Sequence, residues 1–400
     1  MTSSTRKLPD LSKAKWLNEP RLQSLLAILN RGGETRIAGG AVRNALLGMP
    51  IADVDLATTF VPQDVTQMAK GAGFGVHPTG IDHGTVTVVA RGATFEVTTL
   101  RRDVETDGRH AHVAFTNNFA EDASRRDFTI NALYLDRKGK IYDFTDGYTD
   151  ILKRRVRFVG EATQRITEDY LRILRFFRFF AAYAKGAPDR AGLAACKKHK
   201  AGLDGLSAER IRQELFKLLA APRAAEALEI MAKAGILKHI VPYTDQWRVI
   251  KRLSPDPVLR LFAIASAPST LKEKLRLSND EAQRIEGLMA SPELKSDFTA
   301  KEARAKLYEM GVQAWRDAVQ LSWAKGRAGK ADKAWSKLLK LPDDWPVPSL
   351  PISGKDLLAK GFGPGPDLGQ VLKQAEAHWV ASDFKATRDE LLNFVESQKV

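Results

Sequence analysis

Apolar and polar positions along the chain follow two different patterns, and the change falls near residue 150. The first part holds short runs rich in β-branched residues, separated by Gly, Asp and Asn, which is typical of strands joined by turns. These runs lie at residues 35–38, 54–58, 85–89, 94–99, 132–135 and 141–144. Segments with helical spacing interrupt them at residues 21–29, 41–47 and 62–69. The pattern predicts an N-terminal domain in which strands and helices mix.

From residue 167 onward, the spacing of apolar residues is helical almost to the end. The clearest amphipathic segments are residues 168–183, 208–220, 224–234, 256–265, 279–289 and 301–309. Several prolines in residues 341–351 indicate a linker, and residues 352–369 carry a Gly- and Pro-rich turn between two short helices. The pattern thus predicts an α/β or α+β N-terminal domain followed by an all-helical array.

The chain is basic, because its 400 residues include 62 Lys and Arg against 48 Asp and Glu, a formal charge of +14. This excess favours a polyanionic partner such as nucleic acid, but it also fits a basic protein that has none. No apolar run reaches the roughly 18 residues that a membrane helix needs. The single cysteine, Cys196, cannot form an internal disulfide. We therefore expect a cytoplasmic protein without a membrane span.

The first segment that suggests chemistry is a predicted strand that ends in Gly39 and Gly40 and leads into a helix. Glycines let the backbone approach a ligand closely, and the free N–H groups at a helix start favour an anion. Arg43, in the first turn, can add a forked donor to a phosphate. Taken alone, a pair of glycines is more often an ordinary hinge between a strand and a helix.

Asp53 and Asp55 fall in the next predicted strand, with Val54 between them. Residues two apart in a strand point to the same face, so both carboxylates would project together. They repel each other unless a divalent cation lies between them, and two Mg²⁺ ions held in this way can align a hydroxyl with a triphosphate. An isolated Asp-x-Asp is more often a turn. With the glycine turn before it, we favour a metal site.

A second polar cluster, Arg126 and Asp127, lies in the otherwise apolar segment S-R-R-D-F-T-I-N-A-L. Taken alone, this pair also fits a surface ion pair at the end of a strand. Glu96, on a neighbouring predicted strand, is a candidate third carboxylate for the metal site. A half-exposed strand residue would fit its position equally well.

The third motif is E-D-Y-L-R-I-L-R-F-F-R-F, in which Asp169, Arg172, Arg175 and Arg178 stand three apart and would form one stripe of a helix. A salt-bridged, solvated helix face would give the same pattern. As chemistry, Asp169 can accept from an exocyclic amino group while Arg172 donates to the neighbouring ring acceptor. Cytosine and adenine offer an amino group beside a ring acceptor, whereas guanine and uracil offer a carbonyl and an N–H. Such a pair would select C and A.

These segments together resemble the bacterial tRNA nucleotidyltransferase/poly(A) polymerase family, within the polymerase-β-like nucleotidyltransferase superfamily. The matching motifs are G-G-A-V-R, D-V-D, R-R-D-F-T-I-N-A-L and E-D-Y-L-R-I-L-R-F-F-R-F, in this order. A later segment, L-S-A-E-R-I-R-Q-E-L, resembles a further helix of the family. The resemblance implies an α+β fold class with four parts. These are a nucleotidyltransferase head (1–150), a neck with the nucleotide-template helix (151–222), a helical body (223–342) and a tRNA-binding tail (343–400).

The resemblance also implies roles for single residues. The nucleotide-binding positions would be Gly39, Gly40, Arg43, Arg126, Asp169, Arg172, Arg175 and Arg178. The catalytic positions would be Asp53, Asp55 and Asp127, with Mg²⁺, or alternatively Mn²⁺, at Asp53 and Asp55. The third acidic group stays open between Glu96 and Asp127. The family usually has Asp where this chain has Asn44, which puts a charge at that position in question.

The implied activity is the template-independent addition of C, C and A to the 3′ end of tRNA, using CTP and ATP and releasing pyrophosphate. We infer neither a membrane nor an obligate protein partner. Basic residues of the later helices would contact the tRNA phosphates, although a solvated helix face fits each of them as well. Examples are Lys301, Arg304, Lys306, Lys325, Arg327, Lys330, Lys333 and Lys337. Because the chain contains no His-Asp dipeptide, we expect no metal-dependent phosphohydrolase activity of the kind that some members carry.

Three alternatives stay open. A poly(A) polymerase or a partial adder, CC-only or A-only, would share all four motifs. A noncatalytic RNA-binding relative would not need the two intact Asp residues of the D-V-D motif, and a small-molecule nucleotidyltransferase would not need the long basic helical region. Residues 101–117 predict a mobile loop, in which His110 and His112 are too few for a metal site. Its length favours a full CCA adder, because family members that stop after CC tend to have a shortened loop.

Overall fold

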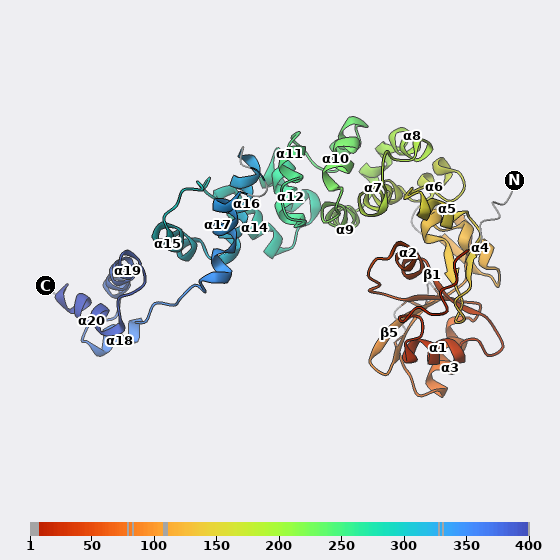
Figure 1. Cartoon of the computed structure of the whole chain (residues 1–400), viewed down its shortest axis with the longest axis horizontal. Coiled ribbons are helices and arrows are strands. Elements are labelled where there is room, and N and C mark those ends of the chain that lie inside the picture. The colour runs from red at the N-terminus through yellow and green to blue at the C-terminus, as the bar shows by residue number, and fades with distance from the viewer. Residues whose placement is uncertain are drawn as a thin grey trace. The chain divides into compact units, whose positions relative to one another are not determined.

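The computed structural model describes residues 8–77, 80–81, 84–106, 111–326, 329 and 332–398, without the side chains of 103–113. It divides into two compact units, Met1–Pro242 and Tyr243–Val400. In Figure 1 the first runs from red to green and contains the sheet, and the second runs to blue and is helical. The finer division into head, neck, body and tail stays a prediction.

The first unit is built on a seven-stranded sheet, counted over the described residues, in the order β3-β4-β5-β2-β1-β8-β9. Strands β2 and β5 run parallel, and every other neighbouring pair is antiparallel. The strands are β1 (Thr35–Ala38), β2 (Asp55–Thr58), β3 (Gly75–His77), β4 (Thr85–Ala90), β5 (Ala93–Thr99), β8 (Leu133–Leu135) and β9 (Ile141–Asp143). The short β-branched runs therefore form the strands that their composition predicts, whereas β3, an edge strand, carried too weak a pattern to be expected.

The sheet buries its apolar positions under helices. Along β4, Val86, Val88 and Ala90 are buried and alternate with half-buried residues, as the period of two requires. Helices α1 (Pro20–Ile28) and α3 (Pro62–Gly71) pack against β4, and α2 (Gly40–Leu47) packs against β1 and β8. On the central strands β2 and β5, the acidic residues Asp55 and Glu96 stay exposed, and the candidate site lies there.

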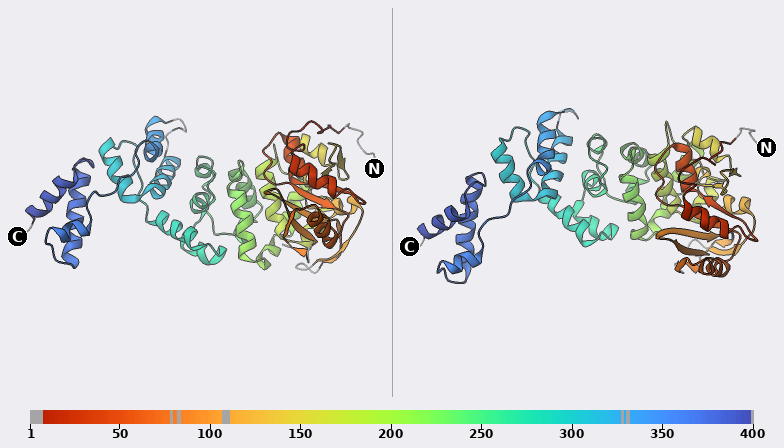
Figure 2. Two further views of the ribbon diagram at one scale, coloured as in Figure 1. Left: turned by 90° about the horizontal axis from the view of Figure 1, so that it is seen from below. Right: turned by 60° about the horizontal axis from the view of Figure 1, so that its bottom comes forward.

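Helices complete the first unit. They are α4 (Phe119–Ser124), α5 (Gly147–Leu152), α6 (Ala162–Glu168), α7 (Leu171–Tyr183), α8 (Arg190–Lys198), α9 (Ala208–Leu219) and α10 (Ala224–Lys233). Helix α7 packs against α9 and α10, and Figure 2 shows these green helices side by side. The leucines and phenylalanines of α7 are buried, and Phe176 lies against Phe128 and Phe158 at ring distances of 6.3 and 5.5 Å. The buried side predicted for this helix is confirmed.

The second unit consists of helices over the residues that the structure describes. They are α11 (Trp247–Ile250), α12 (Pro257–Ile264), α13 (Leu271–Leu275), α14 (Asn279–Ala290), α15 (Ala300–Met310), α16 (Val312–Lys325), α17 (Lys333–Asp344), α18 (Gly354–Ala359), α19 (Pro366–Ala381) and α20 (Arg388–Ser397). One hydrophobic core gathers around Trp315 and Trp335, and another around Leu357 and Trp379. In neither unit is a described helix both long and apolar enough to cross a membrane.

Two segments differ from their predictions. Within the segment 101–117, predicted to be a loop, the described residues include two antiparallel strands, β6 (Arg101–Thr106) and β7 (Ala111–Phe115). The pairing was not predicted because β6, R-R-D-V-E-T, is strongly charged, although Ala111, Val113 and Phe115 stand two apart in β7. His110 and the side chain of His112 lie outside the described residues. The predicted linker at 341–351 begins late, because α17 continues through Pro342 to Asp344.

Candidate active site

A cleft of about 430 Å³ opens in the first unit between the central strands β2 and β5 and the helices that follow the sheet. Its wall is strongly charged, with carboxylates from β2 and β5 and guanidinium groups from β6 and from the helices and their ends. The lining residues are Ala38, Asp55, Leu56, Glu96, Thr98, Arg101, Arg125, Arg126, Asp127, Asp169, Leu171, Arg172, Arg175 and Arg210. Such a wall suits a ligand that carries both phosphates and a hydrogen-bonding ring.

Asp55 and Glu96 lie side by side in the cleft, because the parallel strands β2 and β5 pair these two residues. Burial and the neighbouring charges of Glu96 and Asp53 raise the pKa of Asp55. Asp53 is exposed and precedes β2, which begins at Asp55. The prediction that both aspartates belong to one regular strand is therefore wrong, although their charges still interact. The reason is that the chain pairs with β1 only from Asp55 onward.

The carboxylate pair of Asp55 and Glu96 fits a divalent cation that arrives with its substrate. Among the described residues, no group of three His, Cys, Asp or Glu side chains is arranged to hold a metal by itself. Mg²⁺ is commonly bound by one or two carboxylates together with substrate phosphates and water. After desolvation, the charges of Glu96 and Asp53 also raise the pKa of Asp55, and a cation would relieve that repulsion.

Gly39 gives the turn before α2 its shape. Its φ of +64° lies in the left-handed region, and its N–H donates to the carbonyl of Leu133 at 3.0 Å. A Cβ on Gly39 would lie 3.1 Å from Nη1 of Arg126 and 3.2 Å from the carbonyl of Asn131. A Cβ on Gly40 would meet nothing closer than 3.7 Å. The backbone therefore requires glycine at the first position and tolerates a side chain at the second.

Arg43 is not brought to the cleft. Its side chain is buried, with Nη2 donating to the Tyr183 hydroxyl at 2.8 Å and Nη1 donating to Oδ1 of Asn131. Its guanidinium also lies 4.0 Å from the centre of the Tyr183 ring. Oδ1 of Asn44 accepts from Arg43, so the amide at this position supplies a neutral acceptor where a carboxylate would supply a charge. In this arrangement Arg43 joins α2 to α7.

Arg126 is held at the cleft by a residue that the sequence did not single out, Asp122. Oδ2 of Asp122 accepts from Arg126 at 3.1 and 3.2 Å and from the Tyr134 hydroxyl at 2.6 Å, while Oδ1 accepts from Arg125 at 2.6 and 2.8 Å. Burial would raise the pKa of Asp122, but the charges of Arg126 and Arg125 outweigh it, and the pKa is lowered. The spacing of three and four residues to two arginines was a signal for this network.

Asp127 faces the cleft with its hydrogen-bonding capacity filled. Oδ2 accepts two bonds from Arg175, and Oδ1 accepts from the N–H of Phe128 at 2.8 Å and from Nδ2 of Asn131 at 3.1 Å. Burial would raise the pKa of Asp127, but the charge of Arg175 and these hydrogen bonds lower it. A carboxylate has about four acceptor sites. This geometry suits a residue that positions Arg175 better than one that takes up a proton.

Asp169 and Arg172 both line the cleft, but each has a partner of its own. Asp169 is not on the helix as predicted, because α6 ends at Glu168 and the extended backbone of Asp169 (φ −155°) separates it from α7. Its carboxylate pairs with Arg210 of α9 at 2.9 Å. Arg172 donates to Glu168 and, at 2.7 Å, to the carbonyl of Arg165.

The other predicted arginine of this stripe, Arg178, does not line the cleft. It pairs with the buried carboxylate of Glu214 at 2.9 Å, and Arg175 lies 3.8 Å from the same carboxylate. Glu214 and Arg210 both come from the segment L-S-A-E-R-I-R-Q-E-L. The sequence predicts this segment to be a helix. Only the fold shows that Arg210 pairs with Asp169 and that Glu214 lies against Arg175 and Arg178.

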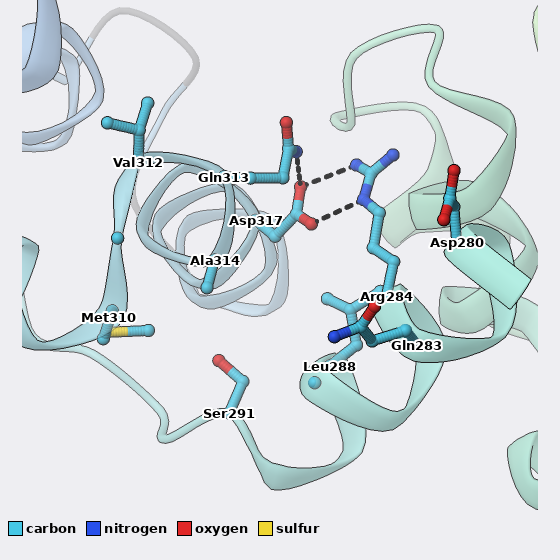
Figure 3. Close-up of a pocket in the computed structure, with 12 residues that line it drawn as sticks. Asp280, Gln283, Arg284, Leu288, Ser291, Met310, Val312, Gln313, Ala314 and Asp317 are labelled. Atoms are coloured by element: carbon cyan, nitrogen blue, oxygen red, sulfur yellow. Dashed lines mark hydrogen bonds and ion pairs between the residues drawn. The ribbon is translucent and has the colours of Figure 1, made fainter.

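A second cavity, of about 580 Å³, lies in the second unit between α14 and the start of α16. Figure 3 shows Arg284 donating through two nitrogens to Asp317, both at 2.8 Å, with Gln313 donating to the same carboxylate at 3.0 Å. A third nitrogen of Arg284 donates to Asp256 at 2.8 Å. Because these charges are paired with one another, the network joins helices, and we assign the cavity no chemistry.

Comparison with known proteins agrees with this geometry. Family models match residues 35–157 (Poly A polymerase head domain), 188–248 (probable RNA- and SrmB-binding site of polymerase A) and 259–395 (tRNA nucleotidyltransferase domain 2). The chain is 35% identical to the mouse (Mus musculus) mitochondrial CCA tRNA nucleotidyltransferase 1, covering 95% of this chain and 92% of the mouse protein.

A bacterial relative, the CCA-adding enzyme of Lactobacillus delbrueckii subsp. bulgaricus, is 31% identical over 91% of this chain and 94% of its own. The crystal structure of the Bacillus stearothermophilus CCA-adding enzyme in complex with CTP superposes with a TM-score of 0.77 at 27% identity, covering 95% of this chain and 98% of that one. The resemblance and the α+β fold class expected from the motifs are thereby confirmed. The chain belongs to the family of CCA-adding tRNA nucleotidyltransferases.

Proposed function

We propose that this enzyme adds C, C and A in turn to the 3′ end of tRNA without a nucleic-acid template, using CTP and ATP. One observation carries the proposal: the same cleft holds a carboxylate pair, Asp55 and Glu96, and a separate acceptor and donor, Asp169 and Arg172. The first pair suits phosphoryl chemistry and the second suits the pairing edge of a base.

In the reaction, the 3′ hydroxyl of the tRNA attacks the α-phosphorus of the bound nucleotide, the bond to the β-phosphate oxygen breaks, and pyrophosphate leaves. Asp53 and Asp55 would hold Mg²⁺, or Mn²⁺, which when bound lowers the pKa of the hydroxyl and neutralises charge on the phosphates. Arg126 and Arg175 would bind phosphate oxygens with forked, charge-assisted hydrogen bonds. Asp127 orients Arg175 and is a positioning residue in this scheme.

Selection of the base would rest on hydrogen-bond polarity. Asp169 accepts from the amino group of C or A, and Arg172 donates to the ring nitrogen beside it. Guanine and uracil would place a carbonyl against the carboxylate and an N–H against the guanidinium. Both contacts would be left unpaired after losing water, which disfavours binding of these bases.

Basic side chains of the second unit would contact tRNA phosphates without reading bases. Lys325, Lys333 and Lys337 are candidates for such contacts. Arg304 and Lys306 are already paired with Asp383 and Glu309, which weakens their case, and Arg327 and Lys330 lie outside the described residues. We also propose a cytoplasmic location, supported by a single cysteine that is buried and unpaired.

The test is extension of a tRNA transcript that ends at the discriminator base, in Mg²⁺, with each labelled nucleotide alone and then with CTP and ATP together. We expect two additions with CTP alone and a stop after three with both. A long A ladder on unrelated RNA would identify a poly(A) polymerase, and a stop after two additions a CC adder. No extension at all would refute the catalytic proposal.

The matching variant is Asp53→Ala, which should abolish incorporation of every nucleotide while tRNA binding survives. The exposed Asp64, in the first turn of α3, provides the control. Asp64→Ala removes a carboxylate from the same unit and should leave both properties unchanged. Retained turnover in Asp53→Ala would overturn the assignment of this carboxylate.

A further inference from the structure

The side chain of Asn131 lies between two buried charges of opposite sign. Its Oδ1 accepts from Nη1 of Arg43, and its Nδ2 donates to Oδ1 of Asp127 at 3.1 Å. A guanidinium only donates and a carboxylate only accepts, so the amide has one orientation that satisfies both. Asn131 is 8% exposed, and its two partners are buried as well. Loss of the amide would therefore cost each charge a hydrogen bond that bulk water does not readily replace.

The main chain of the same residue holds another arginine of the cleft. The carbonyl of Asn131 accepts from Nη1 of Arg126 at 3.2 Å, and a Cβ on Gly39 would lie 3.2 Å from that carbonyl. The N–H of Asn131 donates to the carbonyl of Phe128 at 2.9 Å and closes the 3₁₀ turn Thr129–Asn131. Asn131 thus contacts the glycine turn and Arg126 through its backbone, and Asp127 through its side chain.

The two side-chain bonds of Asn131 also connect it to α7. Oδ2 of Asp127, the oxygen that Asn131 leaves free, accepts two bonds from Arg175. Nη2 of Arg43 donates to the hydroxyl of Tyr183, the last residue of the same helix, at 2.8 Å. Asn131 is thereby joined to α7 at two places, through a carboxylate at one and a guanidinium at the other.

We propose that Asn131 is a positioning residue for the phosphate-binding side of the cleft: its amide fixes Asp127, and with it Arg175, while its carbonyl fixes Arg126. This inference rests on the proposed function, in which these two arginines bind phosphate oxygens, and deepens it. Guanidinium groups held in place before the nucleotide arrives need no reorganisation to bind it. The amide is required because a carboxylate at this position would accept from Arg43 but would face Asp127 with a like charge.

The expected defect affects every nucleotide alike. Phosphates are common to CTP, ATP and UTP, whereas the choice of base is assigned to Asp169 and Arg172. In the part of the chain that the structure describes, no hydrogen bond of Asn131 reaches either of these two residues. Loss of the amide should therefore lower kcat/KM for all nucleotides by one factor and leave the UTP/CTP ratio unchanged.

The experiment is a double-mutant cycle on kcat/KM for CTP with a tRNA transcript, in the parent enzyme, Asn131→Asp, Asp127→Asn and the double variant. Asn131→Asp should lower kcat/KM about 10- to 100-fold, the change that corresponds to losing one hydrogen bond to a charged group. In the Asp127→Asn background the same substitution should cost less than about threefold, because the amide at position 127 can donate to the new carboxylate.

Asn30→Asp provides the matched control. Asn30 is half-buried in the same unit, and its amide bonds to main-chain atoms of Leu26 and Thr35. This substitution makes the same chemical change away from the cleft. It should leave kcat/KM for CTP and the UTP/CTP ratio unchanged.

Equal losses from Asn131→Asp in the two backgrounds would overturn the inference, and so would a changed UTP/CTP ratio. If Asn131→Asp does not fold, Asn131→Ala takes its place: an equal loss for CTP and ATP supports the inference, and an unchanged kcat/KM overturns it. If the parent enzyme adds no nucleotide, the proposed function is refuted. The inference is then decided separately by the equilibrium dissociation constants for CTP of the four proteins in the cycle, where additive effects would overturn it.

Discussion

Replacing Asp122 by Asn should both destabilise the first unit and weaken catalysis. The substitution keeps the shape of the side chain but removes the charge that Arg125 and Arg126 share, and it turns amide hydrogens toward their guanidinium groups. Asp122 is 1% exposed, whereas the side chains of the two arginines are 17% and 22% exposed. The charge that is lost therefore belongs to a buried carboxylate, whereas the two guanidinium groups that lose their partner keep some contact with water.

The magnitude follows from this burial. Removing one member of a buried ion pair costs about 3–5 kcal/mol. Partial hydration of the two arginines places the expected loss at the lower end, about 3 kcal/mol in the free energy of unfolding. The activity should fall as well, because Arg126 loses the acceptor that orients it at the cleft.

Hydrogen exchange is the suitable assay, because Trp16 is the only tryptophan before residue 243 and fluorescence would mainly follow the second unit. Amides of residues 119–135 should exchange about 100-fold faster in Asp122→Asn at neutral pH. The exposed Asp64→Asn is the control. A change of less than about fivefold, roughly 1 kcal/mol, would refute the buried-network argument.

The effect should also depend on pH. The folded-state pKa of Asp122 lies below its ordinary value of 3.8, so its contribution to stability is present above about pH 4 and is lost as the pH falls through the lowered pKa. The parent and Asp122→Asn should therefore converge in acid. A difference in stability that persists unchanged well below that pKa would contradict the assignment.

Three further outcomes are expected. Gly39→Ala should lower the free energy of unfolding by about 1–2 kcal/mol and reduce nucleotide incorporation, because φ is positive and a Cβ would meet the Arg126 guanidinium. Gly40→Ala should be tolerated. Equal urea midpoints for the two variants would contradict this. Glu96→Gln should raise stability in EDTA by about 0.2–1 kcal/mol by relieving repulsion at Asp55, a gain that added Mg²⁺ should diminish. Asp317→Asn should lower the free energy of unfolding of the second unit by about 3 kcal/mol, seen as a lower urea midpoint in tryptophan fluorescence, without altering nucleotide choice.

The sequence predicted most of what is local. Apolar runs with a period of two became strands, and the leucines and phenylalanines of residues 168–183 became the buried side of α7, because burial acts directly on side-chain periodicity. The pairing of β6 with β7 was not predicted, because β6 is strongly charged and backbone pairing leaves little trace in such a sequence. The break in the helix at Asp169 was not predicted, because a single extended residue between two helices barely disturbs the helical spacing of apolar residues.

The sequence by itself determined which charged groups the site contains and the order in which the chain supplies them. Only the tertiary structure decided their pairing. A stripe of residues three apart suggested that Asp169 and Arg172 share one face of a helix. In the fold, Asp169 pairs with Arg210, 41 residues away, and Asp127 pairs with Arg175, 48 residues away. The physical reason is that a carboxylate pairs with the nearest suitable donor in space, and packing of α7 against α9 and against Phe128 sets that distance.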